Sequence, residues 1–150
     1  METGGEPLMR GGIHHIDLTV KDAYASRAFY ESVLGFMGYR ISGSISDFSD
    51  TAPNGYDFDL RDGGDFCSIG ILSARGPNAG RGHDRYSAGL HHIAWTAASR
   101  DDVDAMHQHL LSMGATILDA PAEYPRYGAG YYAVFFADPD GLKLEYVHKP

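Results

Sequence analysis

Two copies of one short stretch decide the fold: HIDLTV at residues 15–20 and HIAWTA at residues 92–97. In both copies larger apolar residues alternate with other side chains, which is typical of a half-buried β-strand. The second copy begins 77 residues after the first (92 − 15 = 77). Two copies of one unit in so short a chain imply gene duplication and a pseudo-twofold architecture, in which a site shared between the halves is natural.

A helix is expected after each copy. Asp22 is the expected N-cap of the first helix, and Gly35 and Gly38 are expected to end it. Ser99 is the expected N-cap of the second. The apolar stripes that predict these helices are Ala25, Phe29 and Val33 in the first, and Val103, Met106, Leu110 and Met113 in the second.

Three strand-like stretches follow each helix, separated by turns rich in Gly, Pro and Asn. They lie at 38–42, 56–61 and 66–72 in the first half, and at 116–118, 131–136 and 142–147 in the second. We therefore expect an α+β fold, with a single domain over 1–150 built from two tandem βαβββ modules. The modules span about 12–74 and 90–148, and a glycine-rich connector at about 75–89 joins them.

Composition narrows the function classes. The formal net charge of −8 is spread along the chain and there is no run of Lys and Arg, so neither nucleic acid nor a membrane surface is an expected partner. Residues 1–7 lack the pattern of a secretory signal, and we expect a cytoplasmic protein. The single cysteine, Cys67, excludes an internal disulfide and a zinc–cysteine cluster. Any metal must therefore be held by histidine and carboxylate.

Strand alternation selects three candidate metal ligands. His15 and His92 lie opposite the aliphatic residues of their strands, and Glu145 lies opposite its neighbours in the last strand, so all three point to the concave side. His14 and His91 are expected on the other face. Two imidazoles and one carboxylate form the facial triad that suits Fe(II) or a similar ion and leaves coordination positions open.

Each of these residues also has a simpler interpretation. A single histidine at the start of a strand is more often structural or on the surface, and a glutamate near the chain end is usually solvated. The coincidence favours the metal site, because both histidines occupy equivalent positions of a duplicated unit and the carboxylate lies on the correct face.

Two further motifs resemble the vicinal oxygen chelate superfamily, which includes glyoxalases, bleomycin-resistance proteins and extradiol dioxygenases. They are FYESVLGF at 29–36 and DPDGLKLE at 138–145, and with His15 and His92 the resemblance covers nearly all of 12–148. It implies paired βαβββ modules closing a cup around a metal, whose ligands are His15, His92 and Glu145. It also implies that the substrate binds this metal through one or two oxygens.

The chain departs from two subfamilies of the resemblance. Glyoxalase I has a fourth ligand in the first module, and here the equivalent position is Ser68 or Gly70, which disfavours chemistry with four protein ligands. Extradiol dioxygenases usually have a tyrosine where this chain has Phe135, and a histidine near Arg126 and Tyr127. We expect Tyr131 and Tyr127 as catalytic groups, and Arg126 and Phe135 as substrate contacts, although such an aromatic strand is often only core.

The sequence therefore predicts a divalent-metal-dependent enzyme that chelates a small oxygen-bearing substrate, with a preference for extradiol-type dioxygenation. Fe(II) is the favoured metal, and Mn(II), Ni(II) or Zn(II) are alternatives. The competing functions are a glyoxalase-like lyase or isomerase, and a non-catalytic protein that sequesters a drug. A homodimer is the expected assembly.

Overall fold

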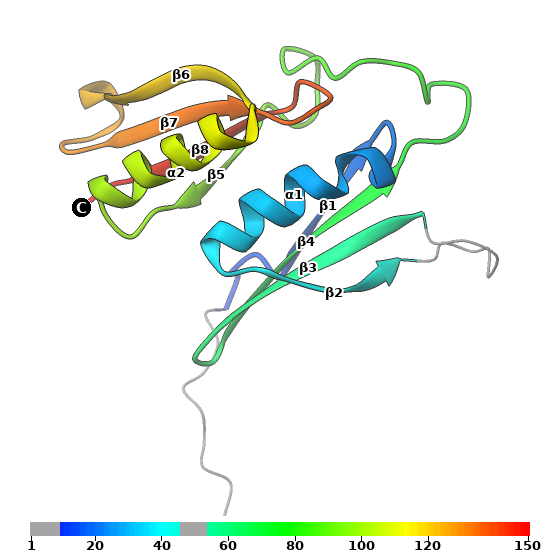
Figure 1. The fold of residues 1–150 in the computed structure, drawn as a ribbon, viewed down its shortest axis with the longest axis horizontal. Helices are drawn as coiled ribbons and strands as arrows, with labels where there is room; N and C mark the ends of the chain where they lie inside the picture. The colour runs from blue at the N-terminus through cyan, green and yellow to red at the C-terminus, as the bar shows by residue number, and fades with distance from the viewer. Residues whose placement is uncertain (1–9, 46–53) are drawn as a thin grey trace, which may run out of the picture. The chain divides into compact units, whose positions relative to one another are not determined.

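The computed structural model describes residues 10–45 and 54–150, and these form parts of two compact units, 1–80 and 81–150. The division at Gly80 falls inside the predicted connector. Each unit consists of a strand, a long helix and three more strands (Figure 1). The predicted pair of βαβββ modules is thereby confirmed.

The first unit is a four-stranded sheet with one helix on it. Its sheet has the order β1-β4-β3-β2, in which β1 is parallel to β4 and the other pairs are antiparallel. The elements are β1 (His15–Val20), α1 (Ala23–Met37), β2 (Arg40–Ile45), β3 (Gly55–Asp62) and β4 (Asp65–Ser73). Alternation in β1 buries Leu18 and Val20 and leaves His15 and Asp17 exposed, as predicted.

Helix α1 begins and ends at side chains that the sequence offers for this purpose. The carboxylate of Asp22 accepts hydrogen bonds from the backbone N–H groups of Tyr24 and Ala25, in the first turn of the helix. Gly38 has a φ of 104° and ends the helix in the left-handed conformation that glycine tolerates. Gly35, expected to help end the helix, lies inside it, so this expectation was wrong.

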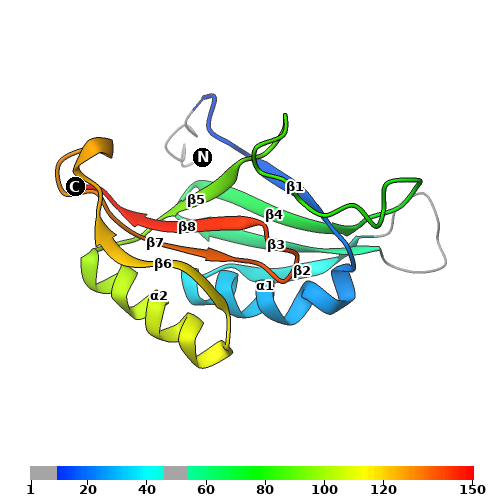
Figure 2. The ribbon, with the colours of Figure 1, turned by 90° about the horizontal axis from the view of Figure 1, so that it is seen from above.

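The second unit repeats this topology. Its sheet has the order β5-β8-β7-β6, with β5 parallel to β8, and α2 covers one face (Figure 2). The elements are β5 (His92–Thr96), α2 (Arg100–Met113), β6 (Thr116–Glu123), the short 3-10 helix η1 (Pro125–Tyr127), β7 (Tyr132–Ala137) and β8 (Lys143–His148). Ser99 caps α2 by accepting from the N–H of Asp102, as predicted.

The core of the second unit lies between α2 and its sheet. Val103, Met106 and Leu110 of the helix are fully buried, as are Phe136 and Leu144 of the sheet. One face of the sheet therefore packs against α2, and the opposite face can carry a site. Among the described residues, no helix is long and apolar enough to cross a membrane.

Candidate functional site

A tight turn leads into β8 and fixes where Glu145 lies. Asp138 is buried and its Oδ1 accepts hydrogen bonds from the backbone N–H groups of Asp140 and Leu142. Gly141 completes the turn with a φ of 85°. The carboxylate of Asp138 thus takes the place of backbone partners that the turn cannot supply. This arrangement explains why the Asp-Pro-Asp-Gly motif precedes the strand.

Glu145 lies on the sheet face opposite α2. Its neighbour Leu144 is fully buried, and the hydroxyl of Tyr146 donates to Oδ2 of Asp102 at 2.6 Å, close to the start of α2. Because successive side chains in a strand alternate, Glu145 points to the other face. The predicted face assignment for this residue is confirmed by these contacts.

Glu145 is a buried carboxylate with two partners. It is only 2% exposed, its Oε1 lies 3.0 Å from Nε2 of His92, and its Oε2 accepts a hydrogen bond from the hydroxyl of Tyr131. A carboxylate with so little access to water is costly unless such partners stabilise it. The structure therefore brings together one predicted ligand pair and one predicted catalytic residue.

The distance between Nε2 of His92 and Oε1 of Glu145 is one that two ligands of the same metal ion can have. In an octahedral site, ligand bonds of about 2.1 Å at right angles place two donor atoms about 3 Å apart. The observed 3.0 Å between Nε2 and Oε1 fits adjacent ligands of one ion. Within 10–45 and 54–150, no group of three or more His, Cys, Asp or Glu side chains is arranged to hold a metal. His92 and Glu145 are thus spaced as two ligands of one metal ion, and a metal site would need a third ligand from elsewhere.

His15 belongs to the first unit and occupies the position in β1 that His92 occupies in β5. It is exposed, and in the parallel ladder it lies opposite Ser68, as His92 lies opposite Lys143. The two histidines are therefore equivalent in strand register as well as in sequence.

Strand register also identifies the counterpart of Glu145. In the second unit Ala94 lies opposite Glu145, and in the first unit Asp17 lies opposite Gly70. Of the two positions considered from the sequence, 70 is the equivalent one. A Cβ added to Gly70 would lie 2.3 Å from Oδ1 of Asp17 and 3.0 Å from Oδ1 of Asp57. The space above the glycine is thus filled by two neighbouring carboxylates.

Ser68 and Gly70 suggested that the first unit has no carboxylate at the place equivalent to Glu145, but Asp17 and Asp57 lie there. Burial, followed by the charges of Asp17 and Asp59, raises the pKa of Asp57. Position 70 itself has no acidic side chain, but the neighbouring strands β1 and β3 place Asp17 and Asp57 beside it. The sequence comparison missed this because it considered only positions 68 and 70 as equivalents of Glu145, although alternation in β1 already put Asp17 on the face of His15.

Four aromatic rings stand beside Glu145 in the second unit. Tyr131 lies 5.3 Å from Tyr127 between ring centroids, and Tyr124 lies 5.4 Å from Phe135. Phe135 is directly opposite Glu145 in the ladder between β7 and β8. Burial, and next the hydrogen bond to Glu145, raise the pKa of Tyr131 far above its ordinary value. The hydroxyl of Tyr131 therefore acts as a hydrogen-bond donor to Glu145.

The remaining predicted contacts lie toward the edge of this cluster. Tyr127 is 48% exposed, and Arg126 both donates to its hydroxyl at 3.0 Å and lies over its ring. Lys143 lies over the ring of Phe135 at 4.5 Å. Tyr124, which directly follows β6, was not predicted, because that strand was expected to end at 118 and instead extends to Glu123. Tyr127 and Arg126 are thus accessible to a ligand, whereas Phe135 forms a buried wall.

The histidine preceding each candidate ligand does not behave as predicted. Nδ1 of His14 lies 3.0 Å from Nδ1 of His15, and Nδ1 of His91 lies 2.7 Å from Nδ1 of His92. We expected His14 and His91 to turn away to the opposite face. That expectation was wrong because both lie just before the first residue of their strand, where strict alternation does not hold.

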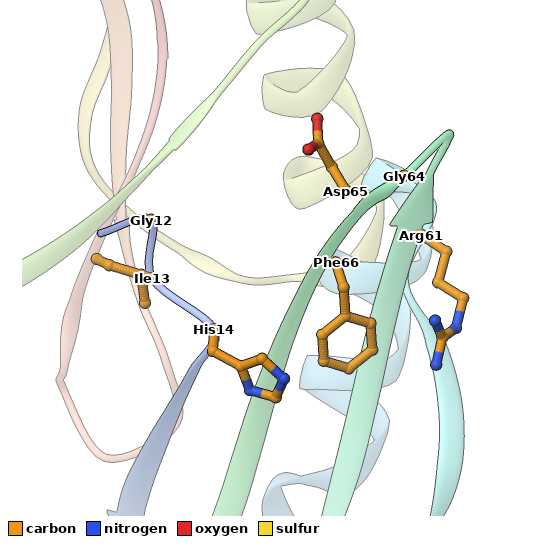
Figure 3. A pocket seen from close by; sticks show the side chains of 7 residues that line it. All are labelled: Gly12, Ile13, His14, Arg61, Gly64, Asp65 and Phe66. Atoms are coloured by element: carbon orange, nitrogen blue, oxygen red, sulfur yellow. The ribbon is translucent and has the colours of Figure 1, made fainter. Parts of the chain in front are cut away.

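The first unit carries a hollow of about 710 Å³ next to His14 (Figure 3). The rings of His14 and Phe66 are tilted by 47° to each other with centroids 4.9 Å apart, and Arg61 lies over the Phe66 ring at 4.6 Å. The hollow is lined by Gly12, Ile13, His14, Arg61, Gly64, Asp65 and Phe66. Through His14, it adjoins His15.

Comparison with known proteins assigns the family. Residues 12–146 match the model of the Glyoxalase/Bleomycin resistance protein/Dioxygenase superfamily. The match covers most of the chain, and its two modules have the topology described above. The protein belongs to this superfamily.

Particular relatives agree with this assignment. The chain is 33% identical over 139 residues to the uncharacterized protein YqjT of Bacillus subtilis, covering 90% of this chain and 97% of YqjT. A crystal structure of a putative glyoxalase from Bacillus halodurans is 28% identical with a TM-score of 0.73, covering 93% of this chain and 97% of that one. Lactoylglutathione lyase from Agrobacterium tumefaciens shares the fold at 16% identity, with a TM-score of 0.63 and coverage of 92% and 93%.

Proposed function

We propose that the protein is a divalent-metal-dependent enzyme that holds a small substrate by its oxygen atoms. The observation that supports this proposal most strongly is that the carboxylate of Glu145 is buried and its Oε1 lies 3.0 Å from Nε2 of His92. His15 is proposed as the third ligand because it is the counterpart of His92 in sequence and in register. A bound metal would polarise a chelated substrate oxygen, and two histidines with a carboxylate suit Fe(II), Mn(II), Ni(II) or Zn(II).

The aromatic residues around Glu145 have distinct roles in this proposal. The hydroxyl of Tyr131 donates a hydrogen bond to Glu145, so it lies where it can donate a hydrogen bond or a proton to a bound substrate. Phe135 supplies an apolar wall, and Arg126 with Tyr127 contacts the part of the substrate nearest to solvent.

Proton transfer of the lyase or isomerase type is the reaction that these residues support best. Such a reaction needs a base, and Asp17 and Asp57 bring carboxylates to the position of a fourth ligand in the first unit. The similarity to a putative glyoxalase at 28% identity points to the same class. Ring-cleaving dioxygenation is the second candidate, because a donor set of two histidines and one carboxylate leaves positions for substrate and dioxygen.

A metal and oxygen screen distinguishes these reactions. The metal-free protein is reconstituted without oxygen with Fe(II), Mn(II) or Ni(II), and thiol adducts of 2-oxoaldehydes and catechols are offered separately. We expect turnover of a thiol adduct without oxygen, and with Ni(II) as well as Mn(II). Oxygen consumption that matches catechol cleavage and occurs only with Fe(II) would instead establish the dioxygenase. Tight binding of these compounds with no product under any condition would indicate a sequestering protein.

A further inference from the structure

The same histidine pair occurs twice in the molecule. In each unit the candidate ligand at the start of a strand, His15 or His92, shares a hydrogen bond through Nδ1 with the histidine before it. The rings of His14 and His91 also have similar surroundings: His14 packs against Phe66 at 4.9 Å, and His91 packs edge-on against Tyr86 at 5.9 Å. Because the contact recurs in both halves of a duplicated fold, it is a property of the repeated unit.

The geometry around His92 shows which nitrogen faces the site. Nε2 points to the buried carboxylate of Glu145, so Nδ1 is the nitrogen that points away, toward His91. A histidine that binds a metal through Nε2 must carry its proton on Nδ1. That N–H then needs an acceptor, and an acceptor at this place fixes both the tautomer and the orientation of the ring. Nδ1 of His91 can fill this role when the proton of that ring is on Nε2.

We propose that His14 and His91 are positioning residues that accept a hydrogen bond from Nδ1–H of His15 and His92 and thereby present Nε2 of each ligand to the metal. This inference rests on the proposed metal site and adds two residues to it. The acceptor is an imidazole in both units, in place of the carboxylate or backbone carbonyl that commonly supports a metal-bound histidine. His14 also lines the hollow of the first unit, so a molecule bound there contacts the partner of His15.

Matched substitutions at His91 and His14 test the proposal. His91→Phe keeps a ring and removes the acceptor, whereas His91→Asn restores an oxygen near the place of Nδ1. Affinity for Zn(II) is measured by competition with a chelator. We expect a loss of about 10–100-fold for His91→Phe and for His14→Phe, and a smaller loss for the two asparagine variants. His107→Phe on α2, which covers the opposite face of the sheet, is the control and is expected to bind as the parent does.

A spectroscopic readout separates positioning from a general loss of structure. In the Zn(II) form of the parent, the Nδ1–H proton of His92 should give a downfield signal in the proton NMR spectrum, and this proton should exchange slowly with water. The signal should broaden or vanish in His91→Phe, while the melting temperature of the metal-free chain stays unchanged. Equal Zn(II) affinity and an unchanged signal in both phenylalanine variants would overturn the positioning role. A parent that binds no Zn(II) would instead overturn the metal site itself.

Discussion

Glu145→Gln is expected to lower the affinity for a divalent metal by more than about 100-fold, beyond the range seen when only a supporting residue is lost. The amide keeps the size of the side chain and can still accept from Tyr131, but it removes the negative charge that attracts a divalent ion. The measurement is a chelator competition with Mn(II) or Zn(II) on the folded variant. Activity with every metal should disappear in parallel.

The matched control for this substitution is Glu123→Gln. Glu123 is a carboxylate of the same unit, but it lies on the surface of β6 in an ion pair with Arg100, with a side chain that is 59% exposed. We expect metal affinity and activity to be unchanged in this variant. Retention of metal by Glu145→Gln, or equal losses in the two variants, would remove Glu145 from the site.

Leu110→Ala is expected to destabilise the fold by about 2–5 kcal/mol, the usual range for a buried leucine that leaves a cavity. Leu110 is fully buried in the interface between α2 and its sheet, on the face opposite Glu145. Leu111 is the next residue of the same helix and is 50% exposed, so Leu111→Ala is a control with the same change in chemistry. It is expected to stay within about 0.5 kcal/mol of the parent.

Urea unfolding of the two variants measures this difference, provided that the slope of the transition is unchanged. The comparison tests which face of the sheet α2 covers. Glu145 points away from α2 only if the helix face that contains Leu110 packs against the sheet. Similar stabilities for Leu110→Ala and Leu111→Ala would show that this helix face is not the buried one.

The elements and their order could be predicted because local signals and the repeat agree. Asp22 and Ser99 cap the helices where the sequence placed them, and alternation put Leu18 and Leu144 into the core. The strand β6 could not be delimited, because its residues are mostly exposed and its pairing with β7 contains irregularities. A strand without a buried face carries little alternation to read.

The site was predictable only where strand alternation or a motif governs it. Glu145 follows a motif, and its contact with His92 and Tyr131 agrees with the predicted face. The carboxylates over Gly70 and the histidine pairs were missed for a different reason. They depend on contacts across neighbouring strands and at the first residue of a strand, which a single-strand pattern does not encode. The homodimer stays a prediction.

The most direct test of the proposed site is the number of metal ions that one chain binds. The metal-free protein is titrated with Ni(II) in a calorimeter, and His92→Ala is titrated under the same conditions. We expect saturation at about one ion per chain for the parent, because His15, His92 and Glu145 would supply a single site. No such saturation is expected for His92→Ala. A parent that takes up no ion, or one ion that binds equally well to His92→Ala, would contradict the metal centre proposed at His92 and Glu145.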